Sequence, residues 1–355
     1  CTAEPGESGR PGCSTLQEVS TTWVQWLLQR ESDTVYTRTI RRNRPSVPVE
    51  SGFHGINMTS IALVTNPISG SGRSLQACNE LQAILVEAGH SVTLVHSSLD
   101  PVRSWLDPVL QESDLVLAAG GDGTVRMVAE SASRTGTPLH QIPMGTENLF
   151  ARTFGMTAEP SDLIDAIESW QVEQLDMIEV AGVHGLLMIG FGFDAAVVCE
   201  LAARRRGPIS HWTYVPIVLR QLLRWRPVPM QVAVDGQPVA TACSGLCFVC
   251  NSREYGGGFN PAPMACMHDG ALDVVVLPTR SRFGLLRWML KARRGRHLDD
   301  VRAIHVQGRS VELAFESSML WQLDGDPPPE ASGVERLGMK ILPGVLPVLL
   351  PAHSG

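Results

Sequence analysis

The chain has 355 residues, of which 44% are hydrophobic and 18% are charged, the composition of a globular protein with room for two domains. Its formal net charge of -7 excludes a general attraction to nucleic acid, so we expect no nucleic-acid partner. No apolar run reaches the roughly 20 residues of a membrane-spanning helix, so we expect no transmembrane segment. Scattered cysteines without a recognisable signal peptide indicate free thiols in a reducing compartment, which predicts a cytoplasmic location.

The first 57 residues differ in composition from the rest of the chain. They are rich in Ser, Thr, Gly, Pro and Arg and show little apolar periodicity. Met58 stands directly before a clean apolar segment, residues 61–65. We therefore expect residues 1–57 to be a disordered extension or a start-site artefact.

From residue 58 to about residue 155, short apolar strands alternate with amphipathic helices. The expected strands are residues 61–65, 91–96, 115–119 and 140–143, and the expected helices are residues 75–88, 101–111 and 124–133. This alternation predicts a parallel sheet covered by helices on both faces, in an α/β domain over residues 58–175. Ligands of such sheets bind beyond the C-terminal ends of the strands, so we expect the functional site in the loops that follow the strands.

After about residue 176 the pattern becomes mainly β. The expected strands are residues 174–180, 185–191, 228–234, 245–251, 272–277, 303–306, 311–315 and 319–323. Two expected helices, near residues 210–225 and 282–294, interrupt them. We assign residues 176–338 to a second, mainly β domain.

The strongest local signal is the sequence GGDGT at residues 120–124, between a predicted strand and a predicted helix. Adjacent glycines let backbone amides point at a phosphate, and the N-terminus of the helix adds its dipole. Asp122 can reach a phosphate-bound metal, and the Thr124 hydroxyl can cap the helix. An ordinary strand–turn–helix needs one glycine at most, so the pattern favours phosphate binding.

Two more loops follow strands of the same predicted sheet. Residues 66–73 read NPISGSGR, which suits close approach to a nucleotide but lacks the pattern of a P-loop. Residues 143–152 read PMGTENLFAR, which places Thr146 and Asn148 to hydrogen-bond a nucleotide. Three loops of this kind at one edge of one sheet predict a nucleotide site.

The motifs NPxSG, GGDGT and PxGTxN, in this order, resemble the catalytic domain of diacylglycerol kinases, sphingosine kinases and their bacterial relatives. Residues 255–258 (YGGG), 269–273 (DGALD) and 323–326 (LDGD) resemble the YGGG, DDGxLD and LDGE motifs of that family, and residues 341–351 resemble its closing strand. The resemblance covers about residues 59–351. It implies an α/β domain like that of NAD kinase and diacylglycerol kinase, and a β-sandwich domain that binds the lipid. It also implies an active site in the cleft between them, and a C-terminal strand and tail, residues 339–355, that return to the first domain.

The resemblance also implies the site residues and the cofactors, ATP and Mg²⁺. The residues implied in ATP binding are Asn66, Ser97, Gly120, Gly121, Asp122, Gly123, Thr124, Val125, Arg126, Thr146 and Asn148. The implied catalytic residues are Asp324, as the general base, with Asp122 and Asp326. Asp269 and the backbone carbonyls of Cys266 and Ala271 would hold a structural Mg²⁺, because this cation prefers oxygen ligands. Taken alone, Asp269 and Gly270 indicate a hairpin turn.

Two departures from the family pattern concern the catalytic group. The family usually continues GGDGT with x-Asn-Glu, whereas Arg126 and Met127 stand here, so a carboxylate is missing and Arg126 is expected to pair with phosphate instead. Asp326 replaces the Glu of LDGE and is one methylene shorter. Since a displacement of about 1 Å can cost about a hundredfold in rate, a catalytically impaired pseudokinase that binds nucleotide or lipid stays open.

Two basic segments carry aromatic and aliphatic side chains at helical spacing. They are residues 204–226, with Trp212 and Trp225, and residues 280–296, with Phe283 and Trp288. Such segments suit an interface on anionic lipid, whereas helices that pack on the β domain with a solvated outer face remain the alternative. We expect the lipid to be met at a membrane surface, with the protein peripheral at the inner membrane face; a homodimer is left open.

The sequence therefore predicts an ATP- and Mg²⁺-dependent lipid kinase acting on a primary hydroxyl of diacylglycerol or a sphingoid-type lipid. An NAD kinase is the alternative enzyme, because NAD kinases share GGDGT. The YGGG, DG and LDGD elements argue against it.

Overall fold

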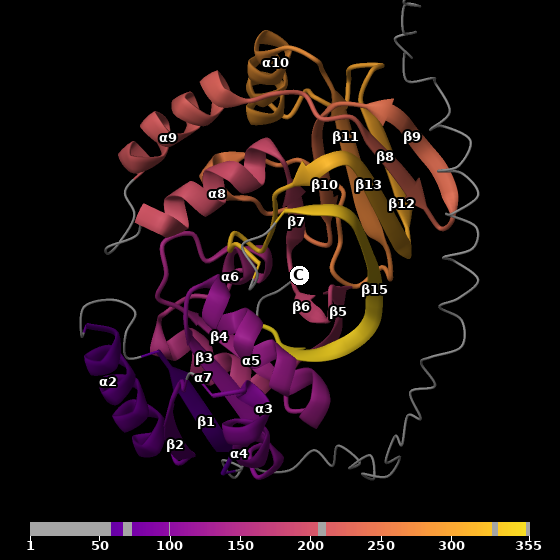
Figure 1. The fold of residues 1–355 in the computed structure, drawn as a ribbon. Helices are drawn as coiled ribbons and strands as arrows, with labels where there is room; N and C mark the ends of the chain where they lie inside the picture. The colour runs from indigo at the N-terminus through magenta and orange to yellow at the C-terminus, as the bar shows by residue number, and fades with distance from the viewer. Residues whose placement is uncertain (1–57, 67–72, 99, 205–210, 329–332, 353–355) are drawn as a thin grey trace, which may run out of the picture. The chain divides into compact units, whose positions relative to one another are not determined.

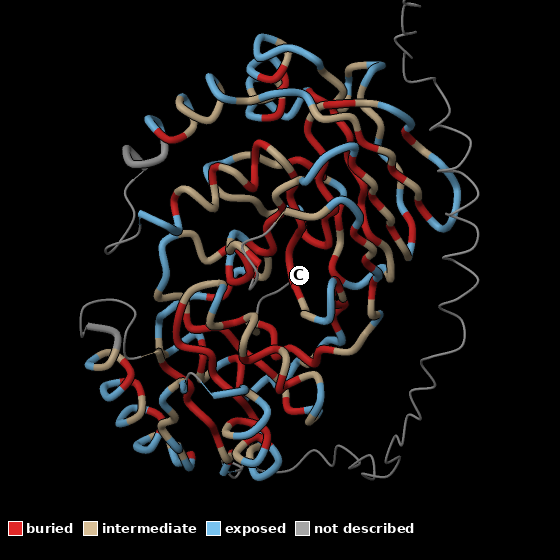
Figure 2. Tube along the Cα trace, in the orientation of Figure 1, coloured by how far each residue is buried: buried red, intermediate tan, exposed pale blue. Residues whose placement is uncertain are grey.

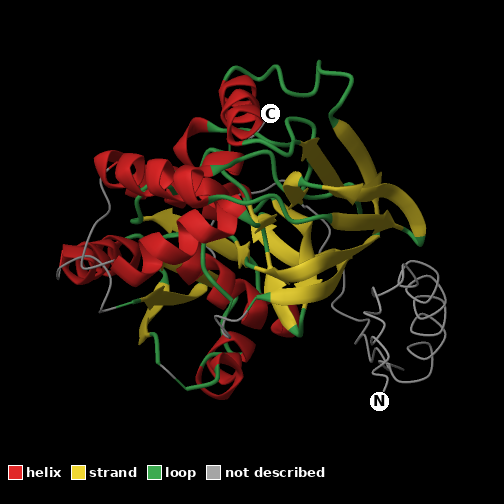
Figure 3. Ribbon diagram, turned by 45° about the horizontal axis from the view of Figure 1, so that its top comes forward, coloured by secondary structure: helices red, strands yellow, loops and turns green. Residues whose placement is uncertain are grey.

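The computed structural model describes residues 58–66, 73–98, 100–204, 211–328 and 333–352. Residues 1–57, for which we expected a disordered extension or a start-site artefact, lie outside the described residues, as do residues 67–72 of the first predicted nucleotide loop. Figures 1 and 3 show the helices and strands of the described part.

The predicted parallel sheet is confirmed. Its strands, in spatial order, are β2 (Ser91–His96), β1 (Ser60–Thr65), β3 (Leu115–Gly120) and β4 (Leu139–Pro143), paired in parallel. Both faces of this sheet are apolar, and β3 is buried along its whole length. Helices α2 (Arg73–Glu87) and α7 (Pro160–Ser169) pack on one face, and α4 (Asp107–Gln111) and α5 (Asp122–Thr135) pack on the other.

The predicted mainly β part is also confirmed, as two sheets packed face to face. The antiparallel second sheet has the order β12 (Ile304–Gly308), β11 (Leu272–Pro278), β10 (Gly245–Cys250), β7 (Met188–Phe191) and β14 (Trp321–Leu323). The first sheet continues from β4 through β15 (Val334–Leu349), β13 (Ser310–Met319), β8 (Met230–Val234) and β9 (Gln237–Cys243). Apolar side chains from both sheets fill the space between them, which makes this part a β-sandwich. Figure 2 shows that burial follows these central strands.

Strand β15 joins the two parts of the fold. It pairs in parallel with β4 at Val348 and Leu139, and antiparallel with β13 and with β5 (Val172–Val180), which in turn pairs with β6 (Val183–Gly185). In Figure 1 it is the long yellow strand that runs from the parallel sheet into the sandwich. The predicted domain boundaries after residues 175 and 338 fall inside β5 and β15, and the division into domains stays a prediction.

Two predicted elements are each divided in the structure. The helix predicted over residues 101–111 is two short helices, α3 (Val102–Trp105) and α4, because Pro108 has no N–H to continue the hydrogen-bond ladder of α3. The strand predicted over residues 185–191 is β6 and β7, which belong to different sheets.

Several helices complete the described part. The predicted helices near residues 210–225 and 282–294 are α9 (His211–Arg224) and α10 (Arg282–Arg293). The pattern did not predict α6 (Leu149–Phe154), α7, α8 (Phe193–Arg204) or β9. Among the helices of the described residues, none is both long and apolar enough to cross a lipid bilayer.

Candidate active site

The second and third predicted nucleotide loops lie directly against each other. A Cβ added to Gly145 would lie 2.6 Å from the Cα of Gly121, so only glycine allows this approach. The Asn148 side chain holds the third loop in shape, since its Oδ1 accepts from the N–H of Gly145 at 2.8 Å and its Nδ2 donates to the Gly145 carbonyl at 3.0 Å. The GGDGT bend and the PMGTEN loop therefore form one glycine-lined surface at the end of β3 and β4.

Asp122 connects the same two loops. It is the first residue of α5, and its Oδ1 accepts a hydrogen bond of 3.0 Å from the N–H of Phe150 in α6. Burial raises the pKa of this carboxyl, the N–H groups of Phe150 and Leu149 lower it, and the negative charge of Asp324 raises it further. The ionised form of Asp122 is therefore disfavoured by burial and, to a smaller extent, by the negative charge of Asp324.

Asp324 sits in a tight turn made by local chemistry. The backbone groups of Leu323 and Asp326 exchange hydrogen bonds of 2.9 and 3.0 Å, and Asp324 and Gly325 have φ angles of +52° and +83°. Two successive positive φ angles define a type I′ turn, for which Asp-Gly is a preferred pair. The sequence LDGD thus folds into a hairpin turn that fixes the position of Asp324.

The carboxylate of Asp324 is buried and receives three backbone N–H groups. Its Oδ2 accepts from Leu186 at 2.8 Å, and its Oδ1 accepts from Leu187 and Met188 at 2.8 and 2.9 Å. These bonds divide the predicted strand 185–191, because the amides turn toward a side chain instead of a neighbouring strand. A carboxylate has about four acceptor positions, so room for one further donor remains.

Burial dominates the ionisation of Asp324. It raises the pKa of this carboxyl above its usual value, while the charge of Arg126 and the three N–H groups act in the opposite direction. A carboxyl with a raised pKa is a better proton acceptor when it is ionised than an ordinary surface aspartate.

Arg126 of α5 binds both ends of the turn that carries Asp324. Its Nη1 donates to the carbonyl of Leu323 at 2.7 Å, and its Nη2 lies 3.0 Å from Oδ2 of Asp326. The same Oδ2 would lie 3.3 Å from a Cβ on Gly123. The structure therefore brings the GGDGT segment and the LDGD turn into contact through Arg126 and Asp326. We had expected Arg126 to face phosphate, and it pairs here with a carboxylate.

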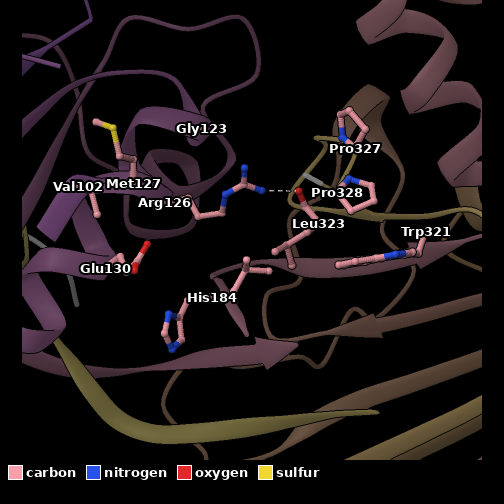
Figure 4. Close-up of a pocket in the computed structure, with 11 residues that line it drawn as sticks. Val102, Gly123, Arg126, Met127, Glu130, His184, Trp321, Leu323, Pro327 and Pro328 are labelled. Carbon is pink, nitrogen blue, oxygen red and sulfur yellow. Dashed lines mark hydrogen bonds between the residues drawn. The ribbon is translucent and has the colours of Figure 1, made fainter. Parts of the chain in front are cut away.

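A pocket of about 290 Å³ lies at this contact, near the small end of ligand pockets. Its walls come from α5 and β6 on one side and from the Trp321–Pro328 stretch on the other, and the Arg126 side chain crosses it (Figure 4). The lining residues are Val102, Gly123, Arg126, Met127, Glu130, Val183, His184, Trp321, Leu323, Pro327 and Pro328. A ligand here would meet the guanidinium of Arg126.

The remaining residues implied in ATP binding lie at the same edge of the parallel sheet or in its loops. Asn66 follows Thr65, which pairs with Ala119 of β3, and the N–H of Ser97 donates to the Thr65 carbonyl at 2.9 Å. Thr146 is exposed in the third loop. Val125 is fully buried in the core and its N–H donates to the Gly121 carbonyl at 3.1 Å, so the structure does not offer its side chain or its N–H to a ligand.

The residues implied in the structural Mg²⁺ site lie around Asp269, in a different part of the fold from Asp324. Asp269 accepts from the N–H of Ala271 at 3.0 Å, and the next N–H, of Gly270, donates to Oδ2 of Asp176 at 2.7 Å. Burial raises the pKa of Asp269, the N–H of Ala271 lowers it, and the charges of Asp273 and Asp176 raise it. The described residues contain no group of three or more His, Cys, Asp or Glu side chains arranged to hold a metal. The implied set has one carboxylate and two carbonyls, and it stays a prediction.

Two buried aspartates near these motifs were not among the predicted site residues. Asp176 joins Gly270 to Gly344 of β15, with the second hydrogen bond at 2.7 Å. Asp194, in the first turn of α8, accepts from the Tyr255 hydroxyl and from Nε2 of Gln322. Burial raises the pKa of Asp194. The YGGG motif pointed to Tyr255, but no local pattern indicated its partner 61 residues away.

Two family descriptions match most of the chain. Residues 60–180 match the diacylglycerol kinase catalytic domain, and residues 187–350 match the YegS C-terminal NAD kinase beta sandwich-like domain. The two matches coincide with the parallel sheet and with the sandwich.

The chain matches two named relatives over nearly the whole of their length. A diacylglycerol kinase of Mycobacterium tuberculosis (strain ATCC 25618 / H37Rv) is 30% identical over 83% of this chain and 96% of its own. A diacylglycerol kinase of Bacillus subtilis (strain 168) is 25% identical over 76% of this chain and 90% of its own. A solved structure of a diacylglycerol kinase from Bacillus anthracis str. Sterne shares the fold, with a TM-score of 0.60 and 19% identity over 84% of this chain and 98% of that one. The chain therefore belongs to the diacylglycerol kinase family.

Proposed function

We propose that this protein transfers the γ-phosphoryl group of ATP to a primary hydroxyl group of a lipid, with diacylglycerol as the first candidate and a sphingoid-type lipid as the second. The observation that carries the proposal is the contact between the GGDGT segment and the LDGD turn through Arg126 and Asp326. Phosphoryl transfer requires a bound triphosphate and a proton acceptor near the same point, and these two segments would supply them.

In this proposal the nucleotide binds along the glycine-lined surface. The backbone N–H groups of residues 121–123 at the N-terminus of α5 would bind the phosphates, whereas the N–H of Thr124 already donates to the Gly121 carbonyl at 2.9 Å. Thr146 and Asn148 would add hydrogen bonds from the third loop, and Asn66 and Ser97 would lie nearer the adenosine.

Asp324 would accept the proton of the lipid hydroxyl. Its position is held by the tight turn and by three N–H groups, and its fourth acceptor position would receive the hydroxyl. The raised pKa supports this role, because a general base works best when its pKa approaches the working pH.

Magnesium fits the charges of this region. Burial raises the pKa of Asp122 most and the negative charge of Asp324 raises it further, and a divalent cation bound beside the carboxylate would offset both effects. Asp122 and Asp326 would hold an Mg²⁺ that, when bound, neutralises phosphate charge. A structural Mg²⁺ at Asp269, with the carbonyls of Cys266 and Ala271, is the second part of this proposal, since the neighbouring carboxylates of Asp176 and Asp273 also disfavour an anion there.

The lipid substrate implies work at a membrane surface. We expect a cytoplasmic protein that attaches peripherally to the inner membrane face. The relatives named diacylglycerol kinase support diacylglycerol as the first lipid to test.

The test is phosphoryl transfer by the purified full chain. Labelled ATP and Mg²⁺ would be supplied with diacylglycerol, sphingosine or NAD, each in a separate reaction. Labelled lipid is the expected product, whereas labelled NAD would overturn the proposal in favour of an NAD kinase.

A second candidate is a pseudokinase that binds nucleotide without turnover. The ion pair between Arg126 and Asp326 favours the pseudokinase, because the pair occupies a carboxylate that the resemblance implies in catalysis. An ATP-induced rise in melting temperature without any labelled product would support this candidate and contradict the kinase.

A further inference from the structure

Helix α9 exposes a stripe of aliphatic side chains. Val215, Leu219 and Leu223 follow each other at intervals of four residues, so they lie on one face of the helix. They expose 58%, 55% and 61% of their surface. Ile217, on another face, is 1% exposed and packs into the core. The helix is therefore apolar on its outer face as well as its inner face.

Helix α10 repeats this arrangement. Phe283, Leu286 and Leu290 are spaced by three and four residues and expose 86%, 38% and 45% of their surface. Leu285 and Trp288 supply the buried face. The two basic segments were expected either to lie on anionic lipid or to pack on the β domain with a solvated outer face. Their inner faces do pack on the protein, but their outer faces expose apolar side chains.

The two helices are neighbours whose inner faces share one core. The Nε of Arg282 in α10 donates to the carbonyl of Trp225, directly after α9, at 3.3 Å. Ile217, Leu285 and Trp288 belong to the same apolar cluster. Figure 1 shows α9 and α10 together beyond α8, and Figure 2 shows exposed outer turns on both helices. The outer stripes therefore both face away from a common interior.

Positive charge flanks the two stripes. Neither helix contains an acidic residue. The carboxylates of Glu200 and Asp300 next to these helices already pair with basic residues, Glu200 with Arg220 and Asp300 with Lys291. Arg224, Arg293 and Arg294 are exposed, and no carboxylate pairs with them among the described residues.

We infer that these stripes and arginines, here called the α9–α10 face, dock the protein on an anionic lipid bilayer. The face consists of Val215, Leu219, Leu223, Phe283, Leu286 and Leu290 with Arg224, Arg293 and Arg294. Apolar side chains enter the boundary between headgroups and acyl chains, and the arginines contact anionic headgroups. A second copy of the same face is disfavoured as the occupant, because it would bring like charges together.

The inference rests on the proposed function only in that a lipid substrate has to be reached at a membrane. Helix α8, which begins directly after β7 with Phe193, packs against α9 and against β14. Strand β7 begins at Met188, whose N–H binds Asp324. One helix layer thus connects the docking face to the strands around the candidate base.

The test is sedimentation of the full chain with vesicles, without ATP. The vesicles would be phosphatidylcholine alone or phosphatidylcholine mixed with phosphatidylglycerol, each at low and high salt. We expect binding to the mixed vesicles that weakens with salt. The triple variant Arg224→Gln, Arg293→Gln, Arg294→Gln should lower the partition coefficient about a hundredfold, because each cation contributes about fivefold. Arg309→Gln, at an exposed arginine before β13, is the charge control.

Apolar variants separate insertion from charge attraction. Leu219→Ser with Leu223→Ser, and separately Phe283→Ser with Leu286→Ser, should each lower vesicle binding about tenfold or more. Ile84→Ser with Val86→Ser, at exposed positions of α2, is the matched control and should bind as the wild type does. Binding that is absent in the wild type, or equal in all variants, would overturn the inference, as would a stable dimer dispersed by the stripe variants.

Kinase assays distinguish this inference from the proposed function. A short-chain diacylglycerol in solution should be phosphorylated equally by the wild type and the stripe variants, while the variants lose activity on vesicle-borne diacylglycerol. If no lipid is phosphorylated but vesicle binding follows the pattern above, the proposed function fails and the docking face stands.

Discussion

The guanidinium of Arg126 lies 3.0 Å from the carboxylate of Asp326, although 200 residues separate them in the chain. The same guanidinium binds the carbonyl of Leu323, so α5 holds both ends of the turn that carries Asp324. Both residues depart from the pattern usual in the family, and the added positive charge of Arg126 is paired with the carboxylate of Asp326.

Replacing Arg126 by Gln should move the acid limb of the kinase pH profile to higher pH. Arg126 lowers the pKa of Asp324 against the larger effect of burial, so its loss raises that pKa further. The base is active when ionised, and activity appears as pH rises through the apparent pKa of the Asp122–Asp324 pair. The measurement is kcat/KM against pH, which reports on the free enzyme.

Arg126→Lys keeps the positive charge and is the control for this pH shift. Its acid limb should remain near that of the wild type even if kcat falls. An unshifted limb in the Gln variant would contradict the assigned role. A double-mutant cycle with Asp326→Asn should give a coupling of only about 0.2–1 kcal/mol in unfolding, because the Asp326 side chain is 40% exposed and solvent screens the pair.

Replacing Asp324 by Asn should lower kcat at least about a hundredfold, since a general base contributes about 10²–10⁴. ATP binding, measured by calorimetry, should persist. An amide would also offer one donor where the carboxylate only accepts, so some loss of stability is expected.

Asp235→Asn controls for that stability effect. Asp235 also has a positive φ, +49°, in an Asp-Gly turn, and its Oδ1 accepts from the N–H groups of Arg309 and Ser310 at 2.9 and 2.8 Å. It lies in the hairpin between β8 and β9 and is solvent-exposed, unlike Asp324. If both variants lost kcat equally, Asp324 would be a structural residue and not the base.

Replacing Gly145 by Ala should raise the KM for ATP about tenfold or more. The new Cβ would lie 2.6 Å from Gly121, so the two loops must separate by about 1 Å, a displacement large enough to disturb a reactive geometry. The comparison is Gly256→Ala, where an added Cβ meets nothing within 4 Å. Equal KM values for both variants would mean that the approach of Gly121 and Gly145 has no part in ATP binding.

Replacing Asp269 by Asn should reduce the stabilisation of the protein by Mg²⁺. A cation that binds only the folded state raises the melting temperature, by about 2–4 °C for each kcal/mol of binding linkage. Calorimetric scans with and without Mg²⁺ would show this rise in the wild type and in Asp299→Asn, an exposed control. A rise of the same size in Asp269→Asn would remove Asp269 from the metal site.

Much of the parallel sheet could be predicted from the sequence, because its strands are short apolar runs and its helices are amphipathic. The nucleotide loops could be placed at its edge for the same reason, since parallel strands end together. The sequence LDGD likewise indicates its own turn through local backbone preference.

The features that escaped prediction depend on contacts between distant residues. Residues 185–191 look like one strand, and contacts with distant residues divide them. The carboxylate of Asp324, 136 or more residues away, binds the N–H groups of residues 186–188, and Asn251 binds the carbonyls of Leu186 and Leu187. The opposite charges of Arg126 and Asp326 are compatible with an ion pair, but no local sequence pattern indicated that α5 and the turn lie next to each other. Strand β15 was predicted only from residue 339 on, although the alternation of buried and exposed residues over 337–341 is itself a strand pattern.

The position of β15 in the chain has a consequence for how the protein is made. This strand completes the sheet beside β4 and β13, yet it is synthesised after all the strands it pairs with. Until it emerges from the ribosome, β4 and β13 present open edges to other chains. The sheet therefore closes only after β15 has been made, through slow pairings between distant segments, and deletion of residues 334–349 would leave β4 and β13 open to aggregation.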